Sequence, residues 1–249
     1  MASACRVLAR PTRRRRVIER MDFDRHAARY RATVNQALRF SGADVDQLAG
    51  HKARVMLALM ARRLGDPRTV KALDVGCGIG LVDRELVSGG GQLCGTDVSQ
   101  KSLSQAASLV PEASFRHFDG QRIPYADKEF DFVFAVCVLH HIPLTGRVGF
   151  VGEMARVTRT GGMVFILEHN PLNPVTRYIV SRCAFDVDAV LLGRSAAVRL
   201  LKQAGLRRGG LSYIGFWPKR SAFVELLERG ISWMPIGAQY YAWGLRAAQ

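Results

Sequence analysis

The sequence lacks the features of a disulfide-rich, metal-binding or membrane-spanning protein. Its 249 residues hold only five cysteines, an odd number with no C-x-x-C pair and no His/Cys spacing typical of a zinc site. We therefore predict no bound metal and a reducing compartment, taken to be the cytoplasm. No apolar run reaches the roughly 18 residues that a membrane-spanning helix needs, because Asp131 interrupts the best candidate.

Negative charge is also scarce. The 21 acidic residues face 36 Lys and Arg, which gives a formal net charge of +15 and can signal a nucleic-acid or anionic-membrane partner. Residues 1–20 hold seven arginines and one glutamate, and we expect them to be a disordered leader or to precede the true start at Met21. An organelle-targeting peptide and a basic arm that touches phosphates or lipid headgroups are the alternatives.

The rest of the chain, residues 21–249, is expected to form a single domain in three parts. Residues 21–66 predict two helices, at Asp22–Phe40 and Asp46–Leu64, since apolar residues recur there at helical steps. Residues 67–206 alternate short apolar runs with helical stretches, which is typical of a parallel sheet with crossover helices. Residues 207–249 hold all three tryptophans and two β-rich runs.

This alternation predicts an α/β fold with a doubly wound, mostly parallel sheet and helices on both faces. An antiparallel C-terminal hairpin should complete it, with a helix near Ser221–Arg229 in the connection. The predicted strands are Lys71–Val75, Gln92–Asp97, Ser114–Phe118, Asp131–Val136, Met163–Glu168, Leu211–Trp217 and Gln239–Leu245.

A glycine-rich loop follows the first predicted strand and contains Asp74, Gly76, Cys77, Gly78 and Gly80. Alternate glycines let the backbone turn tightly and approach a ligand, because a Cβ would occupy the ligand's space. The third glycine of a dinucleotide motif is absent, since position 81 is leucine. The loop therefore predicts close contact with a ligand other than a dinucleotide.

Two carboxylates follow the next two strands. Asp97, with Val98 after it, ends the second strand, and Asp119 with Gly120 follows the third. A carboxylate in the place of Asp97 can accept hydrogen bonds from both hydroxyls of a ribose and would repel a 2′-phosphate.

A fourth element is the apolar strand that ends at Val136, followed by the pair His140 and His141. In this order and spacing, over about residues 71–206, the four elements resemble the class I S-adenosylmethionine-dependent methyltransferases. The histidine pair and a Phe-Asp-x-x-Ala-x-x-Tyr pattern from Phe23 resemble, within that group, the methyltransferase type 11 enzymes of ubiquinone and menaquinone biosynthesis. The resemblance implies a Rossmann-like, seven-stranded sheet, S-adenosyl-L-methionine as cofactor and a role in small-molecule biosynthesis.

The resemblance also implies roles for the site residues. Asp74 would lie near the methionine amino group, and the loop from Gly76 to Gly80 would cradle the cofactor. Asp97 would bind the ribose and Asp119 the adenine amino group. Alternatively, Asp74 could cap the turn and Asp119 could be a solvated turn residue. The predicted cofactor site is completed by Cys77, Val98, Gly120 and Val136.

Methyl transfer from a sulfonium depends mainly on holding the two reactants in line. If the acceptor is a phenol or a carbon acid, a neutral imidazole can take its proton. His141 and His140 are the candidate catalytic residues, with His169 as the second choice, because all three follow strands at the edge where ligands bind. The pair could also pack against the following helix or orient the cofactor.

The acceptor is expected to be a small hydrophobic or aromatic molecule, because a turn at Asn170–Pro174 leads into an apolar helix at Val175–Ala184 that would cover the pocket. The aromatic residues of the C-terminal part could line this pocket, make peripheral membrane contact or belong to the core. Nucleic acid is not expected, since no aromatic residues interleave with a basic stripe. The alternatives are an RNA or protein methyltransferase and a non-catalytic cofactor-binding assembly factor, and the sequence does not decide between O-, C- and N-methylation or indicate an oligomeric state.

Overall fold

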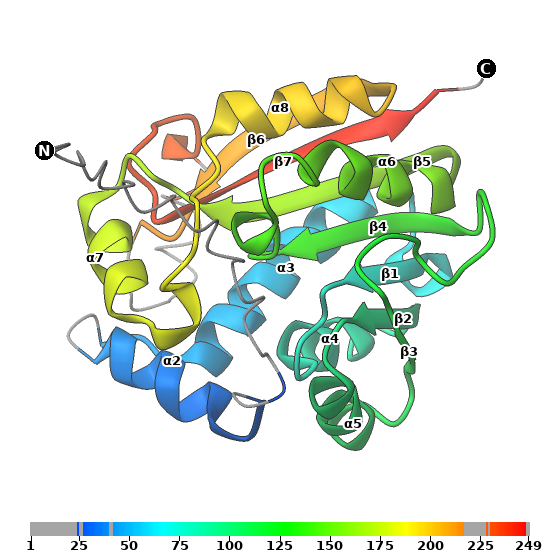
Figure 1. The fold of residues 1–249 in the computed structure, drawn as a ribbon. Coiled ribbons are helices and arrows are strands. Elements are labelled where there is room, and N and C mark those ends of the chain that lie inside the picture. Colours follow the sequence, from blue (N-terminus) through cyan, green and yellow to red (C-terminus); the bar gives the residue numbers. More distant parts are fainter. Residues whose placement is uncertain (1–23, 25–26, 40–41, 217–227, 229, 248–249) are drawn as a thin grey trace, which may run out of the picture.

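The computed structural model describes residues 24, 27–39, 42–216, 228 and 230–247, so the predicted leader at residues 1–20 lies outside these ranges. Figure 1 shows a central sheet with helices on both of its faces. Within the described ranges, no helix combines the length and apolar character needed to cross a bilayer.

The described residues form one seven-stranded sheet in the order β3-β2-β1-β4-β5-β7-β6. The five strands from β3 to β5 pair in parallel, whereas β7 is antiparallel to both β5 and β6. The predicted doubly wound sheet with an antiparallel C-terminal hairpin is thereby confirmed. The strands are β1 (Lys71–Val75), β2 (Gln92–Asp97), β3 (Ser114–His117), β4 (Phe130–Val136), β5 (Thr158–His169), β6 (Leu206–Ile214) and β7 (Gln239–Arg246).

Three strand starts differ from the prediction, and that of β4 differs by only one residue, at Phe130 instead of Asp131. β5 begins at Thr158 instead of Met163, because the strand continues through Gly161 and Gly162 and Thr158 pairs with Phe130. β6 begins at Leu206 instead of Leu211, because Gly205, with a φ of +76°, ends the preceding helix immediately before it. The predicted strand end at Trp217 and the predicted helix at 221–229 fall outside the described ranges, apart from residue 228.

The long helix before the sheet starts at a polar cap, whereas the helix that begins at Tyr30 has no side-chain cap. Asp44 accepts a hydrogen bond from the backbone N–H of Gln47 at 2.8 Å and starts the helix predicted at Asp46–Leu64. The helix predicted at Asp22–Phe40 is described at residue 24, which is helical, and from residue 27, as a short 3₁₀ turn and then an α-helix. The helices are η1 (Ala27–Arg29), α2 (Tyr30–Leu38), α3 (Val45–Arg63), η2 (Pro67–Thr69), α4 (Leu81–Val87), α5 (Gln100–Leu109), η3 (Leu139–His141), α6 (Arg147–Val157), α7 (Pro174–Arg182), η4 (Ala184–Asp186) and α8 (Arg194–Gln203).

Alternate residues of the central strand β4 belong to two different hydrophobic cores. Val133 and Ala135 pack in the core that includes α6 and α8, and Phe132 and Phe134 pack in the core that includes α3 and α4. Helices therefore cover both faces, which explains why β4 is a nearly continuous apolar run. Figure 1 shows α2 and α7 beside the end of the sheet toward which β4 and β5 point.

A β-bulge in β6 makes room for Trp243. The register between β6 and β7 shifts between Arg208 and Gly210, which leaves Gly209 as the extra residue. A Cβ on Gly209 would overlap the buried indole ring. The guanidinium carbon of Arg63 lies 4.9 Å from the centroid of that ring, so the indole has little room to move.

We expect Gly209→Ala to lower the free energy of unfolding by about 1–3 kcal/mol, because the rigid indole cannot yield within a filled core. The matched control is Gly152→Ala in α6, where a Cβ meets nothing within 4 Å and better helix propensity should raise the free energy of unfolding by up to about 1 kcal/mol. Urea unfolding measures both changes. Equal effects of the two substitutions would contradict the overlap.

Candidate cofactor and acceptor site

The glycine-rich loop joins β1 to α4 at the C-terminal edge of the sheet. Gly76, Gly78 and Gly80 have φ angles of +92°, +55° and +79°, which residues with a Cβ rarely adopt. A Cβ on Gly76 would lie 2.6 Å from a methyl carbon of Val138, whereas one on Gly78 would meet nothing within 4 Å. The loop is thus packed on one side, and beside Gly78 its bare backbone has open space.

Hydrogen bonds join this loop to the end of β2. The backbone N–H of Cys77 donates to the carbonyl oxygen of Thr96 at 3.0 Å. Asp97 accepts one hydrogen bond from the N–H of Gly78 and one from the N–H of Ser99, both at 2.8 Å. These bonds orient the carboxylate toward the loop, and a carboxylate has further lone pairs for a ligand.

A pair of buried carboxyl groups lies at the loop. Asp74 is 2% exposed and Asp83 0% exposed, and no described donor bonds to Oδ1 of Asp74 or to either oxygen of Asp83. Burial, together with the charge of Asp83, raises the pKa of Asp74 well above its usual range. Burial also raises the pKa of Asp83 to about 7. The pair therefore retains a proton near neutral pH, and its oxygens would be stabilised by a cation.

The end of β4 carries a strained residue. Cys137 has a φ of +58°, which is uncommon for a residue other than glycine. Its sulfur lies 3.7 Å from Nζ of Lys52 and 3.3 Å from Nε2 of Gln239. Side chains from α3 and β7 thus meet at the end of β4, and strain of this kind tends to occur at functional sites.

The turn η3 directs His140 into a buried network. Its Nδ1 lies 2.6 Å from Oε2 of Glu168, and its Nε2 lies 3.3 Å from Oδ1 of Asp186. Oε1 of Glu168 accepts hydrogen bonds from the N–H groups of Val138 and Leu139 at 3.1 and 2.7 Å. Burial by itself would lower the pKa of His140, but the two carboxylates outweigh it and raise the pKa to about 10. His140 is therefore an imidazolium at neutral pH, with both ring nitrogens engaged.

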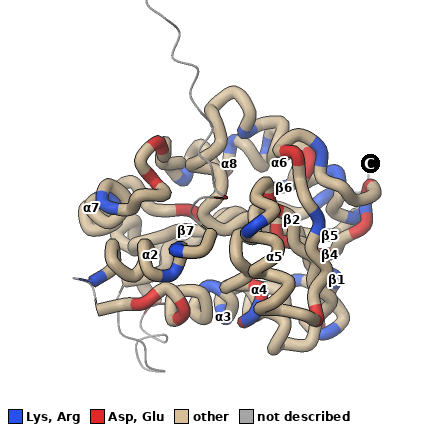
Figure 2. Tube along the Cα trace, turned by 60° about the horizontal axis from the view of Figure 1, so that its bottom comes forward, with Lys and Arg blue, Asp and Glu red and all other residues tan. Residues whose placement is uncertain are grey.

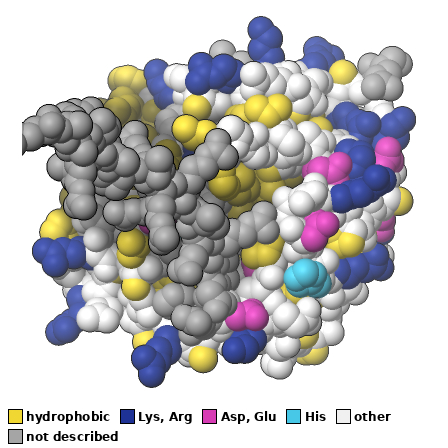
Figure 3. Space-filling view, in the orientation of Figure 1, with side chains coloured by type: hydrophobic (Ala, Val, Ile, Leu, Met, Phe, Trp, Pro, Cys, Tyr) yellow, Lys and Arg dark blue, Asp and Glu magenta, His cyan; other side chains and the backbone are white. Residues whose placement is uncertain are grey.

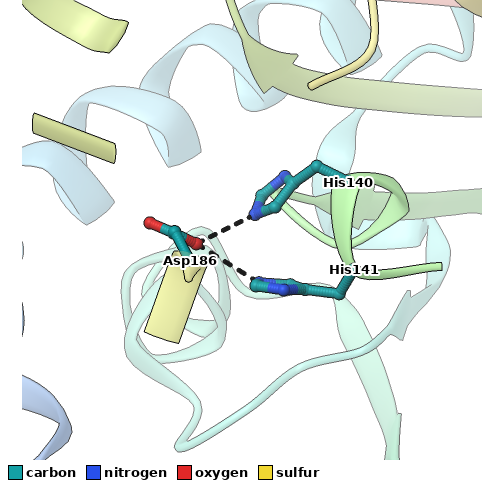
Figure 4. Close-up of side chains that lie close together, drawn as sticks. All are labelled: His140, His141 and Asp186. Atoms are coloured by element: carbon teal, nitrogen blue, oxygen red, sulfur yellow. Dashed lines mark ion pairs between the residues drawn. The ribbon is translucent and has the colours of Figure 1, made fainter. Parts of the chain in front are cut away.

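His141 lies beside His140 but differs from it in exposure and in protonation state. Its Nε2 is 3.5 Å from the same oxygen of Asp186, and its side chain is 20% exposed against 1% for His140. Burial and the adjacent His140 lower the pKa of His141 to about 4. The same two causes lower the pKa of His169 to about 4, and its ring lies 5.1 Å from that of His140. Figure 4 shows both rings of the histidine pair directed at the Asp186 carboxylate.

The remaining residues of the predicted cofactor site range from half-buried to exposed. Val136 is half-buried at the end of β4, and Val98 is 44% exposed. Asp119 and Gly120 are exposed after β3, and Oδ1 of Asp119 accepts hydrogen bonds from two following backbone N–H groups at 2.7 and 2.9 Å. Asp119 thus stabilises its turn, and the adenine role stays a prediction.

Comparisons with known proteins agree with this geometry. Residues 73–166 match the family model described as a methyltransferase domain. The chain is 31% identical over 194 residues to the chloroplastic tocopherol O-methyltransferase of Arabidopsis thaliana, over 65% of this chain and 54% of that protein. It is 33% identical over 178 residues to the 27-O-demethylrifamycin SV methyltransferase of Amycolatopsis mediterranei, over 67% of this chain and 58% of that protein.

A solved structure shares the fold. It is a SAM-dependent methyltransferase from Thermotoga maritima, a possible histamine N-methyltransferase, with a TM-score of 0.63 at 14% identity over 90% of this chain and 98% of that chain. The chain therefore contains a methyltransferase domain at residues 73–166 and has the fold of the class I S-adenosylmethionine-dependent methyltransferases. It spans about half the length of the curated relatives that it matches.

The residues of this methyltransferase fit S-adenosylmethionine, which has a cationic sulfur and an ammonium group. The open space beside Gly78 allows close approach to the backbone. The unpartnered oxygens of Asp74 and Asp83 suit positive charge. Asp97, already held by two N–H groups, has acceptor capacity left for hydroxyls.

Several residues of this region were not predicted from the sequence. A signal existed for Asp83, because an acid between the buried residues Leu81 and Leu86 stands out on an apolar helical face. No signal marked Lys52 or Asp186, since neither lies near a motif in the sequence. The tertiary structure alone brings them to the ends of β1 and β4.

We expect Asp83→Asn to stabilise the methyltransferase at pH 8. The pKa of Asp83 rises from 3.8 to about 7 on folding, so the folded state binds more protons between these values and loses stability as pH rises through them. Removing the ionisable group should then raise the free energy of unfolding at pH 8 by on the order of 1–3 kcal/mol.

Thermal unfolding at pH 5 and pH 8 measures this effect, which should shrink at the lower pH. Glu112→Gln, at an exposed position, is the matched control. A melting temperature that Asp83→Asn leaves unchanged or lowers at pH 8 would show that the carboxyl pair is not strained.

Proposed function

We propose that this methyltransferase transfers the methyl group of S-adenosylmethionine to an O, C or N atom of a small hydrophobic or aromatic metabolite. The observation that carries the proposal is the hydrogen bond from the N–H of Gly78 to Asp97, which joins the glycine-rich loop to a carboxylate at the next strand end. The cofactor would lie between these two elements, with its methionine end toward Asp74 and its ribose on Asp97.

The cofactor supplies an electrophilic methyl group on a cationic sulfur. The acceptor's electron pair forms the new bond to carbon as the carbon–sulfur bond breaks, and the pair from that bond stays on sulfur. Since the reaction destroys a positive charge, the chain's main task is to align the reactants. The strained residue Cys137, held at the end of β4 by Lys52 and Gln239, is well placed to shape this part of the pocket.

His141 is the residue that we propose to receive the acceptor's proton, where the acceptor carries one. It is the more exposed member of the histidine pair. His140 would act as a positioning residue, because Glu168 and Asp186 already engage both of its nitrogens. General base catalysis by an imidazole requires contact with the acceptor, which the buried His140 cannot make.

An apolar cluster beside this pair supports a hydrophobic acceptor. Ala37 of α2 is buried with Cys183 and Phe185, which follow α7. The ring of Tyr30 lies 5.1 Å from that of Phe185. Since Phe185 directly precedes Asp186, the cluster adjoins the histidines. The two relatives named above are a tocopherol O-methyltransferase and a 27-O-demethylrifamycin SV methyltransferase, whereas others are named as C- or N-methyltransferases, so their names leave the methylated atom open.

An apolar and basic surface supports contact with an anionic membrane that supplies such an acceptor. Leu172, Val175 and Tyr178 on and before α7 are 66%, 49% and 49% exposed. Ile236 is 55% exposed and adjoins them, since its carbonyl oxygen accepts a hydrogen bond from Asn173 at 2.7 Å. Hydrophobic and basic side chains lie next to one another at the left edge of Figure 3, where Figure 1 places α7. This combination is typical of peripheral membrane binding.

An RNA or protein acceptor is the second candidate, favoured by the net charge of +15. In Figure 2, Lys and Arg lie on several helices and alternate with Asp and Glu. This scatter gives less support to a nucleic-acid groove than a continuous basic stripe would.

Two variants separate cofactor binding from transfer. We expect Asp97→Ala to weaken S-adenosylmethionine binding by about 10–100-fold, since charged hydrogen bonds contribute about 1.5–3 kcal/mol each. His141→Ala should bind the cofactor normally and slow transfer by about 10²–10⁴-fold if the acceptor must lose a proton. Calorimetry measures binding, and methyl-labelled cofactor with a fractionated cell extract measures transfer.

Glu112→Ala, which removes a carboxylate at an exposed position, is the control and should leave both measurements unchanged. Unaltered cofactor binding by Asp97→Ala would overturn the site assignment. Label that enters RNA or protein instead of the organic phase would favour the second candidate, and binding without any labelled product would favour a non-catalytic role.

Membrane contact has its own test. Val175→Asp should weaken co-sedimentation with phosphatidylglycerol-containing vesicles by about 10-fold, which corresponds to about 1.4 kcal/mol. Val148→Asp is the matched control, since Val148 is 45% exposed on α6 and Val175 is 49% exposed on α7. Equal loss in both variants, or equal binding to phosphatidylcholine vesicles, would contradict a specific anionic surface at α7.

A further inference from the structure

Three side chains beside the proposed acceptor region converge on one point. Nε2 of His140 lies 3.3 Å, and Nε2 of His141 lies 3.5 Å, from Oδ1 of Asp186. One ligand atom from each residue lies within 4.8 Å of the others. Figure 4 shows the carboxylate facing both rings. Two imidazoles and a carboxylate are typical ligands of zinc and related transition metals.

The two separations that involve Asp186 match those around a tetrahedral ion, and the two histidine nitrogens lie within 4.8 Å of one another. Zinc bonds of about 2.0–2.1 Å to nitrogen and oxygen put neighbouring ligand atoms about 3.3–3.4 Å apart. The two distances to Asp186 are 3.3 and 3.5 Å. Three protein ligands leave one coordination position open, and the partial exposure of His141 (20%) and Asp186 (11%) leaves a side from which an ion can enter.

The ring of His140 already has the orientation that a metal ligand requires. Glu168 engages Nδ1 of His140 at 2.6 Å, and this holds Nε2 toward Asp186. A carboxylate behind the distal nitrogen is the usual outer partner of a metal-bound histidine, since it fixes the tautomer and the ring orientation. The chain after Asp186 is tied to η3, because the N–H of Val190 donates to the carbonyl oxygen of His140 at 2.9 Å.

We propose that His140, His141 and Asp186 form a binding site for a divalent transition metal ion, best fitted by zinc, with the fourth position open to water or an acceptor oxygen. The site is distinct from the glycine-rich loop and does not depend on the proposed methyl transfer. Binding of the ion would displace the proton from Nε2 of the His140 imidazolium to solvent, so affinity should rise with pH. A bound ion would also use the lone pair of His141 that could otherwise take a proton, so the two roles of this residue exclude one another.

Cobalt and zinc titrations of the tag-free, chelator-treated whole chain, without S-adenosylmethionine, test the proposal. We expect one equivalent of Co²⁺ to give the intense visible absorption of a four-coordinate ion, without a thiolate charge-transfer band, and Zn²⁺ to displace it. His141→Ala and Asp186→Asn should weaken affinity by at least about 10–100-fold, the loss typical of removing even an outer partner.

The matched controls are His117→Ala and Asp188→Asn, which remove an imidazole and a carboxylate at exposed positions and should leave affinity unchanged. Absence of binding by the wild-type chain, or equal affinity in both ligand variants, would overturn the site. A thiolate band would also overturn it, by assigning the ion to cysteines. Because the wild-type spectrum reports the ligand set directly, the test holds even if one variant fails to fold.

Discussion

The carboxylate of Glu168 joins the two strands whose ends carry the acceptor side of the site. It is completely buried at the end of β5, where an unpaired charge would be very costly. The backbone N–H groups of Val138 and Leu139 and the ring of His140 satisfy it. The turn after β4 must therefore take the one conformation that presents all three donors. The direction of His140, and with it the meeting with Asp186, follows from that requirement.

On the cofactor side of the site, the buried carboxyl groups lack the hydrogen-bond donors that Glu168 has. Asp74 and Asp83 are as deeply buried as Glu168, but three of their oxygens have no described donor. Their ionised forms are accordingly disfavoured, and their pKa values rise. The fold thus holds one carboxylate whose hydrogen-bonding capacity is satisfied and, at the glycine-rich loop, a carboxyl pair whose pKa values stay raised even though Lys52 acts against the rise at Asp74. A cationic ligand would lower these pKa values, which is why the proposed function places the methionine end of the cofactor there.

The fold itself was largely accessible from the sequence. Helices cover both faces of the parallel strands, so these strands read as apolar runs between helical stretches, and β1 and β2 have the predicted bounds. The starts of β5 and β6 were wrong because glycine fits both a turn and a strand. Gly161 and Gly162 lie inside β5, whereas Gly205 ends a helix. Only the pairing of Thr158 with Phe130 shows that Gly161 and Gly162 belong to a strand and not to a turn.

The sequence by itself determined the α/β architecture, the glycine-rich loop and the carboxylate at the end of β2, because each depends on local backbone geometry or on side-chain periodicity. The tertiary structure decided which charges meet. Asp186 reaches the histidine pair only after β5 and α7 have returned the chain to the same edge, and Lys52 reaches Cys137 from a helix that precedes the sheet. The protonation states of His140 and His141 likewise depend on burial and on charged side chains distant in sequence. Electrostatic interactions act through space, and spacing along the chain does not encode them.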